Sequence, residues 1–260
     1  MADIITVIGA PGSGQTTVAM RLACDIYNAL KNASICVINM DSNVPALGVV
    51  FPNKKTSELA SVTALLDKTD MTVENVLRSL VTAPNMKNFG YLGLKAGENR
   101  YSYPIPDKRK IEDLFTALQR EFNFVIVDYS LNEEISRYAL SNADRIVRVF
   151  SPDVKSMAWY VSNKHLVNDT DTRLLNVVNT IDATCCLPME EVIANIKKVD
   201  TTLPCSKAVR QQMMNGELWT PLKDKAYNKK MATLVDKTLD PAGKGRDSKT
   251  EAIDSSGFGS

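Results

Sequence analysis

The sequence predicts a doubly wound α/β fold, in which helices cover both faces of a mainly parallel β-sheet. Short runs of apolar and β-branched residues alternate along the chain with longer stretches whose apolar residues recur at helical spacing. Most of these runs are apolar throughout, as is typical of parallel strands buried on both faces. Strands separated in this way are joined by right-handed helical crossovers.

The first predicted strand is IITVIG at 4–9, and the first helix follows at 16–31. FVIVDYS at 124–130 has the strongest strand pattern of the chain. The other strands are expected at 34–40, 89–94, 145–151 and 174–180. The other helices are expected at 57–66, 73–80, 111–121, 133–141, 155–167, 189–197, 206–215 and 223–239. Together these elements predict one domain over 1–239.

Composition narrows the class of protein. The chain has 260 residues, of which 44% are hydrophobic, so it is large enough for one sizeable core. The formal net charge is +1, which excludes a general electrostatic attraction to nucleic acid or anionic lipid. The last segment, 240–260, is rich in Gly, Ser, Lys and Asp and is expected to be disordered.

The cysteines and the N-terminus indicate a cytoplasmic protein. The N-terminus lacks the basic region of a signal peptide, and no apolar stretch approaches the ~18 residues of a membrane span. None of the cysteines has the CxxC spacing of a metal or redox site, so they are expected to be reduced and mostly buried. They are Cys24, Cys36, Cys185, Cys186 and Cys205.

A glycine-rich loop, GAPGSGQTT at 9–17, connects the first strand to the first helix. It fits the phosphate-binding pattern GxxxxGK[ST] except at the lysine. Gly9, Gly12 and Gly14 allow a tight turn, so that backbone N–H groups and the following helix N-terminus form a site for an anion. Thr16 stands where the hydroxyl ligand of Mg²⁺ is expected. The alternative is a glycine-rich turn that binds nothing.

Gln15 occupies the position of the lysine that contacts the β- and γ-phosphates in such loops. A glutamine amide donates hydrogen bonds but carries no charge. Phosphoryl transfer depends mainly on electrostatic stabilisation and positioning. We therefore expect nucleotide binding to survive through the loop backbone and the metal, and hydrolysis to be slow.

With five further segments, the loop resembles the MinD/ParA family of deviant Walker A ATPases, P-loop NTPases of the SIMIBI class, over about residues 3–222. VINMDSNVPALG at 37–48 is similar to the family's second strand and first switch, with Asp41 in the position near the attacking water. VIVDYS at 125–130 is similar to the Walker B strand, with Asp128 as the carboxylate on the metal side.

Three segments of the second half also resemble the family. LSNADRIVRVFSPDVKSM at 140–157 is similar to a stretch of the form A-D-x-x-x-x-V-x-x-P-x-x-x-S. VVNT at 177–180 resembles the strand whose asparagine contacts adenine, which places Asn179 there. LPCSKAVRQQMMNGELW, which starts at 203 and includes Pro204, resembles the segment that closes the base pocket.

The resemblance implies a homodimer that binds ATP or ADP with Mg²⁺. It assigns the metal to Thr16 and Asp128 and, in an active site, catalysis to Asp41. The residues that it assigns to the nucleotide are Gly9, Gly12, Ser13, Gly14, Gln15, Thr16, Thr17, Asn179 and Pro204.

Three residues of this site depart from the family pattern, and each departure removes charge. Ala10 replaces the family's signature lysine, and Gln15 replaces the second loop lysine. Asn39 stands where the first aspartate of the switch is usual, which weakens the surroundings of the metal. ATP hydrolysis is therefore expected to be weak or absent, as in a pseudo-ATPase.

Two functions follow from the resemblance. The first is a dimerising module that positions or recruits a partner, as in the CpaE/TadZ branch that localises pilus assembly. A secretion or pilus ATPase is then the candidate partner, and the protein is peripheral to a membrane assembly. The second function is an active ParA-type ATPase in DNA partition or on a membrane. Ala10 and Gln15 favour the first, whereas Thr16, Asp41 and Asp128 keep the second open.

The surface segments give little support to DNA or membrane binding. Segment 93–110 combines basic residues with Tyr101 and Tyr103, which suits a partner surface or a solvated connection with packed tyrosines. DNA binding is not expected, because it draws on broad positive charge. The predicted helix at 223–239 lacks the bulky apolar face of a membrane-binding helix, so membrane anchoring is not expected. Trp159 is expected to pack in the core or against a helix.

Overall fold

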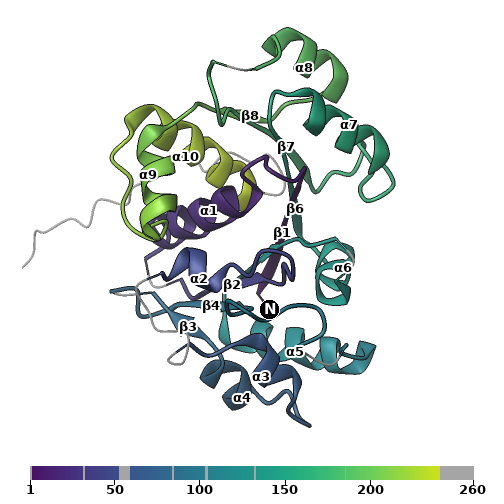
Figure 1. Cartoon of the computed structure of the whole chain (residues 1–260), viewed down its shortest axis with the longest axis vertical. Coiled ribbons are helices and arrows are strands. Elements are labelled where there is room, and N and C mark those ends of the chain that lie inside the picture. Colours follow the sequence, from purple (N-terminus) through teal and green to yellow (C-terminus); the bar gives the residue numbers. More distant parts are fainter. Residues whose placement is uncertain are drawn as a thin grey trace, which may run out of the picture.

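The computed structural model describes residues 2–31, 33–52, 59–83, 85–102, 105–131, 133–184 and 186–240. Within these ranges the chain forms an eight-stranded sheet with helices on both faces, as the sequence predicted (Figure 1). The segment predicted as a disordered tail, 240–260, lies outside the described residues except for Asp240.

The strands follow the order β3-β4-β2-β5-β1-β6-β7-β8. Neighbouring strands are parallel except for β3 and β4, which pair antiparallel. The bounds are β1 Asp3–Gly9, β2 Ile35–Asn39, β3 Val81–Thr82, β4 Phe89–Gly93, β5 Phe124–Asp128, β6 Arg145–Phe150, β7 Leu174–Asn179 and β8 Thr201–Leu203. The doubly wound, mainly parallel sheet is thereby confirmed.

The helices form two layers around this sheet (Figure 1). One layer contains α1 Gln15–Ala29, α2 Leu47–Val50, α9 Lys207–Asn215 and α10 Lys225–Leu239. The other contains α3 Val62–Leu66, α4 Val73–Arg78, α5 Lys108–Glu121 and α6 Glu134–Ser141. Two further helices, α7 Val154–Ser162 and α8 Met189–Ile196, share a smaller apolar cluster with β6 and β7.

The strand β1 shows why the apolar runs are continuous. Its side chains point alternately to the two faces of the sheet. Ile5 and Val7 belong to the apolar cluster under α1 and α10, whereas Ile4 and Ile8 belong to the cluster under α5 and α6. Because helices cover both faces, neither set of side chains contacts water, and the strand has no polar face.

Some elements differ from the sequence prediction. The sequence does not predict β3 and β8, because these strands have two and three residues and include threonines, so they form no apolar run. Helix α7 ends at Ser162 and not at 167, and the side chain of the C-cap residue Asn163 donates to the carbonyl of Trp159 at 2.8 Å. Helix α3 begins at Val62, and 57–58 of the longer predicted helix lie outside the described residues.

The carboxyl ends of the central strands come together at one edge of the sheet. The strand β1 lies between β5 and β6, whereas β2 lies beyond β5. This is the position in an open α/β sheet at which the strand order reverses and ligands bind. Gly9 ends β1, and the register pairs Asn39 at the end of β2 with Asp128 at the end of β5.

Candidate functional site

The loop between β1 and α1 has the backbone of an anion-binding turn. Gly12 and Gly14 adopt φ angles of 86° and 80°, in the left-handed region that favours glycine. The N–H of Ser13 donates to the carbonyl of Ala10 at 2.9 Å and closes the turn. Helix α1 begins at Gln15 with no side chain capping its first N–H groups. These groups are the usual anion donors of such a loop.

A cavity of about 750 Å³ opens beside this loop. Its volume is in the range of pockets that bind small ligands and cofactors. Of the predicted site residues, those that line it are Gly9, Gly12, Gly14, Gln15, Thr16, Thr17, Asp41, Asp128, Asn179 and Pro204. Ser13 is the exception, because its side chain is buried beneath the loop. The structure therefore brings the predicted residues together, and their roles toward a nucleotide stay predictions.

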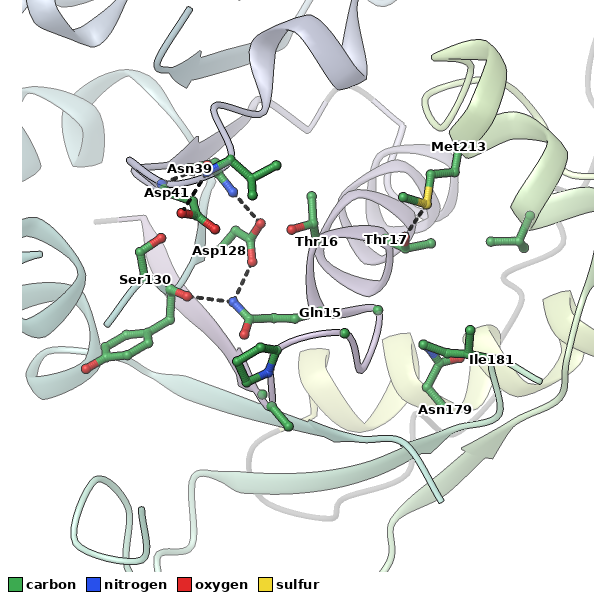
Figure 2. A pocket seen from close by; sticks show the side chains of 18 of the residues that line it. Gln15, Thr16, Thr17, Asn39, Asp41, Asp128, Ser130, Asn179, Ile181 and Met213 are labelled. Carbon is green, nitrogen blue, oxygen red and sulfur yellow. Dashed lines mark hydrogen bonds between the residues drawn. The ribbon is translucent and has the colours of Figure 1, made fainter. Parts of the chain in front are cut away.

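Gln15 is turned toward the end of β5 (Figure 2). Its Nε2 donates to Oδ1 of Asp128 at 2.6 Å and to the backbone carbonyl of Tyr129 at 2.7 Å. An amide nitrogen has two hydrogens, so both are used within the protein. The residue in the lysine position therefore uses its amide N–H groups for contacts within the protein, to Asp128 and Tyr129.

Asp128 is surrounded by neutral donors. Its Oδ2 accepts from Nδ2 of Asn39 at 2.5 Å, and the side chain of Thr16 also hydrogen-bonds to it. Burial raises the pKa of Asp128 to about 6, against the lowering effect of the hydrogen bonds from Thr16, Gln15 and Asn39. The nearby charge of Asp41 raises this pKa further. The carboxylate is thus held by dipoles, and no basic side chain is among the groups that shift its pKa.

This arrangement does not fit the Mg²⁺ site that the resemblance implies. Mg²⁺ requires oxygen ligands in octahedral geometry, whereas two N–H groups point at the carboxylate of Asp128. The side-chain oxygen of Asn39 is also engaged, because it accepts from the N–H of Asp41 at 3.0 Å. In the described part of the chain, His, Cys, Asp and Glu form no group of three that could hold a metal ion. The predicted metal roles of Thr16 and Asp128 stay predictions, and the amide N–H groups directed at Asp128 argue against them.

Asp41 lies at the cavity wall in the loop after β2. Its Oδ1 accepts from the N–H groups of Asn43 at 2.9 Å and Val44 at 3.1 Å, so the carboxylate shapes its own loop. The neighbouring hydroxyl of Ser42 donates to Oε1 of Glu133, the N-cap residue of α6, at 3.0 Å. The loops that follow β2 and β5 are thereby linked.

The opposite side of the cavity is formed by the end of β7 and by α9. The Nδ2 of Asn179 donates to the carbonyl of Ser13 at 2.9 Å and supports the loop. A Cβ added to Gly14 would lie 2.4 Å from this nitrogen, so the close approach requires glycine. Across the cavity, Oγ1 of Thr17 donates to the sulfur of Met213 at 3.7 Å (Figure 2). The predicted contact of Asn179 with adenine stays a prediction.

Sequence reasoning missed several residues around the cavity. Tyr129 contributes its backbone carbonyl and Met213 its sulfur, and neither contribution has a sequence signal. Trp159 packs against two apolar clusters, as predicted, and also lines the cavity, which the sequence did not indicate. Lys155 of α7 is exposed, and its Nζ would lie 3.9 Å from a Cβ added to Gly12. The ammonium group of Lys155 therefore lies beside a loop that has Ala10 and Gln15 where the family pattern has lysines.

The predictions for the surface are corrected in part. Tyr101 is 96% exposed, so it does not pack beneath segment 93–110, and Tyr103 lies outside the described residues. The predicted last helix corresponds to α10, which packs against α1 and buries Tyr227 and Met231. None of the helices within the described ranges is both long and apolar enough to span a bilayer.

The cysteine prediction is correct for only part of the set. Cys24 and Cys36 are buried, and burial raises the pKa of the Cys24 thiol to about 12. Cys186 is exposed and Cys205 is half-buried. Cys185 lies outside the described residues.

Comparison with known proteins supports the fold. No family model and no curated protein matches the sequence. Among solved structures, MinD of Pyrococcus horikoshii complexed with Mg-ADP matches with a TM-score of 0.70 and 14% identity, over 94% of this chain and 98% of that chain. A ParA family ATPase of Chlorobium tepidum matches with a TM-score of 0.70 and 12% identity, over 90% and 99%.

A MinC:MinD complex of Aquifex aeolicus also matches, with a TM-score of 0.66 and 15% identity, over 90% of this chain and 94% of that chain. These likenesses confirm the predicted MinD/ParA type of P-loop fold. At such identities they show the fold alone, and none of them bears on the CpaE/TadZ branch.

Proposed function

We propose that this chain, which has the fold of the MinD/ParA ATPases, is a nucleotide-binding module that dimerises and positions or recruits a partner, with weak or absent ATP hydrolysis. The observation that carries the proposal is the orientation of Gln15. Its amide donates to Asp128 and Tyr129, so it brings no charge to a phosphate and connects the loop to the end of β5. The loop is thereby kept in shape for a ligand without the residue that drives turnover.

The backbone of the loop supports nucleotide binding. The turn with Gly12 and Gly14 in the left-handed region and the uncapped start of α1 offer N–H groups to phosphates. The cavity continues from this loop to Asn179 and Pro204, where the resemblance expects the base. The MinD structure from Pyrococcus horikoshii contains Mg-ADP, which makes ADP and ATP the first ligands to test here.

The missing charges support weak hydrolysis. Ala10, Gln15 and Asn39 are neutral where the family pattern has two lysines and an aspartate. One oxygen of Asp41 is used by the N–H groups of its own loop. Removing one donor that stabilises a transition state costs ~10²–10³ in rate in well-studied enzymes. The loss of two lysine charges is therefore sufficient to make turnover very slow.

The loops after β2 and β5 support a recruitment role. The hydrogen bond between Ser42 and Glu133 links the two loops. Each loop has an exposed apolar side chain at the cavity: Val44 after β2 is 61% exposed, and Leu131 after β5 is 45% exposed. A ligand in the cavity would contact both loops, so its presence could be communicated to an apolar surface. MinD of Aquifex aeolicus is found in complex with MinC. We propose a second copy of this chain and a cytoplasmic protein partner, with a pilus or secretion ATPase as the candidate.

The experiment is calorimetric titration with Mg-ATP and Mg-ADP, followed by measurement of phosphate release and of molar mass on the same samples. Binding without release, with a change from monomer to dimer, is the expected result. Gly14→Ala should abolish binding, because the added Cβ meets Asn179. Gly97→Ala is the control, since Gly97 also has a positive φ but nothing within 4 Å.

Other results would replace the proposal. Rapid phosphate release would establish the alternative, an active ParA-type ATPase in DNA partition or on a membrane, for which Thr16, Asp41 and Asp128 are retained. Absence of binding would leave a scaffold whose loop has no ligand.

A further inference from the structure

We propose that the nucleotide site of this chain works without a divalent cation, because neutral side-chain donors occupy the carboxylate that would otherwise serve the metal. The inference rests on the proposed function, since it concerns how the same nucleotide is held. It starts from the disagreement between the metal ligands that the resemblance implies and the contacts of Asp128.

Each oxygen of Asp128 has an amide N–H directed at it. Gln15 donates to Oδ1 at 2.6 Å and Asn39 donates to Oδ2 at 2.5 Å. Amide hydrogens carry partial positive charge. They therefore occupy the positions next to the carboxylate oxygens where a cation would otherwise bind. The side chain of Thr16, the other predicted ligand, is also hydrogen-bonded to Asp128.

The orientation of both amides is fixed by a second contact. The second hydrogen of the Gln15 amide is bound by the carbonyl of Tyr129. The oxygen of the Asn39 amide accepts from the N–H of Asp41. A flip of either amide would place its oxygen against the carboxylate of Asp128 and break the second contact as well. The N–H groups therefore point at Asp128, and the oxygens that could serve a metal point away.

A cation for the phosphates is available from another element. Lys155 lies at the start of α7 with its Nζ beside Gly12, on the rim of the loop. The side chain is exposed, so it can turn toward an anion in the loop. A lysine ammonium is a flexible point charge that suits phosphate. Lys155 thus supplies charge compensation where the loop has Ala10 and Gln15.

The first experiment compares nucleotide binding with and without the metal. ADP is titrated into the full chain by calorimetry, once with excess Mg²⁺ and once with EDTA. The two dissociation constants are expected to agree within about threefold. Binding that weakens by about tenfold or more in EDTA would overturn the inference and leave the proposed function standing. Absence of binding in both buffers would overturn both.

The second experiment uses variants and a metal probe that does not depend on turnover. Asn39→Asp restores a carboxylate beside Asp128, and Asn43→Asp adds the same charge to the exposed end of the same loop. Electron paramagnetic resonance is used to follow Mn²⁺ binding to the chain with ADP. We expect bound Mn²⁺ in Asn39→Asp only. Bound Mn²⁺ in the unchanged chain would contradict the inference.

The third experiment tests the source of the positive charge. Lys155→Ala is expected to weaken ADP binding in EDTA by about fivefold, and Lys155→Arg to retain it. Lys230→Ala is the matched control, because Lys230 of α10 is also exposed and does not line the cavity. Equal affinity of Lys155→Ala and Lys230→Ala would show that the loop backbone alone compensates the phosphates, and this part of the inference would fail.

Discussion

Asp128 and Asp169 are two carboxylates that are held by different kinds of donor, one at the end of a strand and one beside the sheet. Asp128, at the end of β5, accepts from the amides of Gln15 and Asn39. Asp169, in the segment before β7, accepts from the guanidinium of Arg148 at 2.5 Å and from the hydroxyl of Tyr160 at 2.6 Å. The first cluster contains only neutral donors, whereas the second is built around a positive charge.

The pKa values of the two carboxylates reflect this difference. Burial raises the pKa of Asp128 to about 6, because the dipoles around it do not fully replace water. Burial also acts on Asp169, but the hydrogen bonds from Tyr160 and Arg148 and the charge of Arg148 together lower its pKa. Asp169 is also the more exposed carboxylate, with 20% of its side chain exposed against 2% of Asp128, so burial penalises its charge less. The lower pKa of Asp169 therefore reflects both its greater exposure and its donors Tyr160 and Arg148.

The cluster around Asp169 lies between elements of the fold, whereas the cluster around Asp128 lies at the cavity. Arg148 is 2% exposed, lies 5.0 Å from the ring centroid of Tyr160 and also binds Asn176, so its cluster ties β6 to β7 and α7. The cluster of Asp128 lies at the cavity. This chain thus has a buried positive charge where elements of the fold are connected, whereas the side-chain donors to Asp128 at the cavity are neutral.

The largest predicted effect comes from breaking the charged cluster. Arg148→Met keeps an unbranched apolar side chain but removes the guanidinium that donates to Asp169 and Asn176. We expect the free energy of unfolding to fall by about 3 kcal/mol, at ~1.5 kcal/mol for each of the two hydrogen bonds that the charged guanidinium donates, to half-buried Asp169 and to buried Asn176. Urea unfolding measures the change. Lys164→Met is the control, since Lys164 lies 4.8 Å from the ring centroid of Tyr160 but is exposed. A loss as small as that of the control would contradict the prediction.

The second prediction breaks the neutral cluster in the same way. Gln15→Met removes the hydrogen bonds to Asp128 and Tyr129 and should lower the free energy of unfolding by about 2 kcal/mol, at about 1 kcal/mol for each bond. The control is Gln211→Met, because the Gln211 amide binds Asn215 on the exposed surface of α9. If Gln15→Met were as costly as Arg148→Met, neutral donors would equal a buried charge, and the comparison would lose its basis.

The third prediction separates the backbone of the loop from its side chains. Gly14→Ala and Gly97→Ala both place an alanine at a positive φ, and the two share that cost. Only at Gly14 does the new Cβ meet Asn179 and endanger its bond to Ser13. We therefore expect Gly14→Ala to be the less stable by a further ~1 to 2 kcal/mol in urea unfolding. Equal stabilities would show that Asn179 moves away without loss.

The smallest predicted effect concerns the pH dependence of the charged cluster. Because the pKa of Asp169 is lower in the folded state, the stability from its ionised form is fully present above about pH 4 and is lost as the pH falls through the folded pKa. Asp169→Asn should be less stable than the unchanged chain by about 1 kcal/mol at pH 7, the difference between charged and neutral hydrogen bonds.

The same comparison at low pH completes the test. The two proteins should approach equal stability as the pH is lowered, when Asp169 is protonated in both states of the unchanged chain. Urea unfolding at a series of pH values gives both curves. A constant gap between them would assign the effect of Asp169 to packing and not to charge.

The sequence predicted the fold because burial on both faces of the sheet leaves a signal in each long strand. It could not predict β3 and β8, whose pairing depends on neighbours that complete the sheet and not on their own residues. At the site, sequence reasoning located the segments and the lost charges. The orientation of Gln15 could not be predicted from the sequence. Its amide donates to Asp128, which is 113 positions away and whose location depends on the packing of the whole sheet.

The contact between Thr17 and Met213 has a consequence for kinetics. It joins the start of α1 to α9 at the wall of the cavity, so a ligand that needs more room there would have to separate the hydroxyl from the sulfur. If the proposed nucleotide requires this separation, its association should be slow, because binding that depends on a conformational change has a lower association rate constant. In stopped-flow traces the observed rate should level off as ADP is raised. At the plateau, the rate reports how often α9 lifts away from α1.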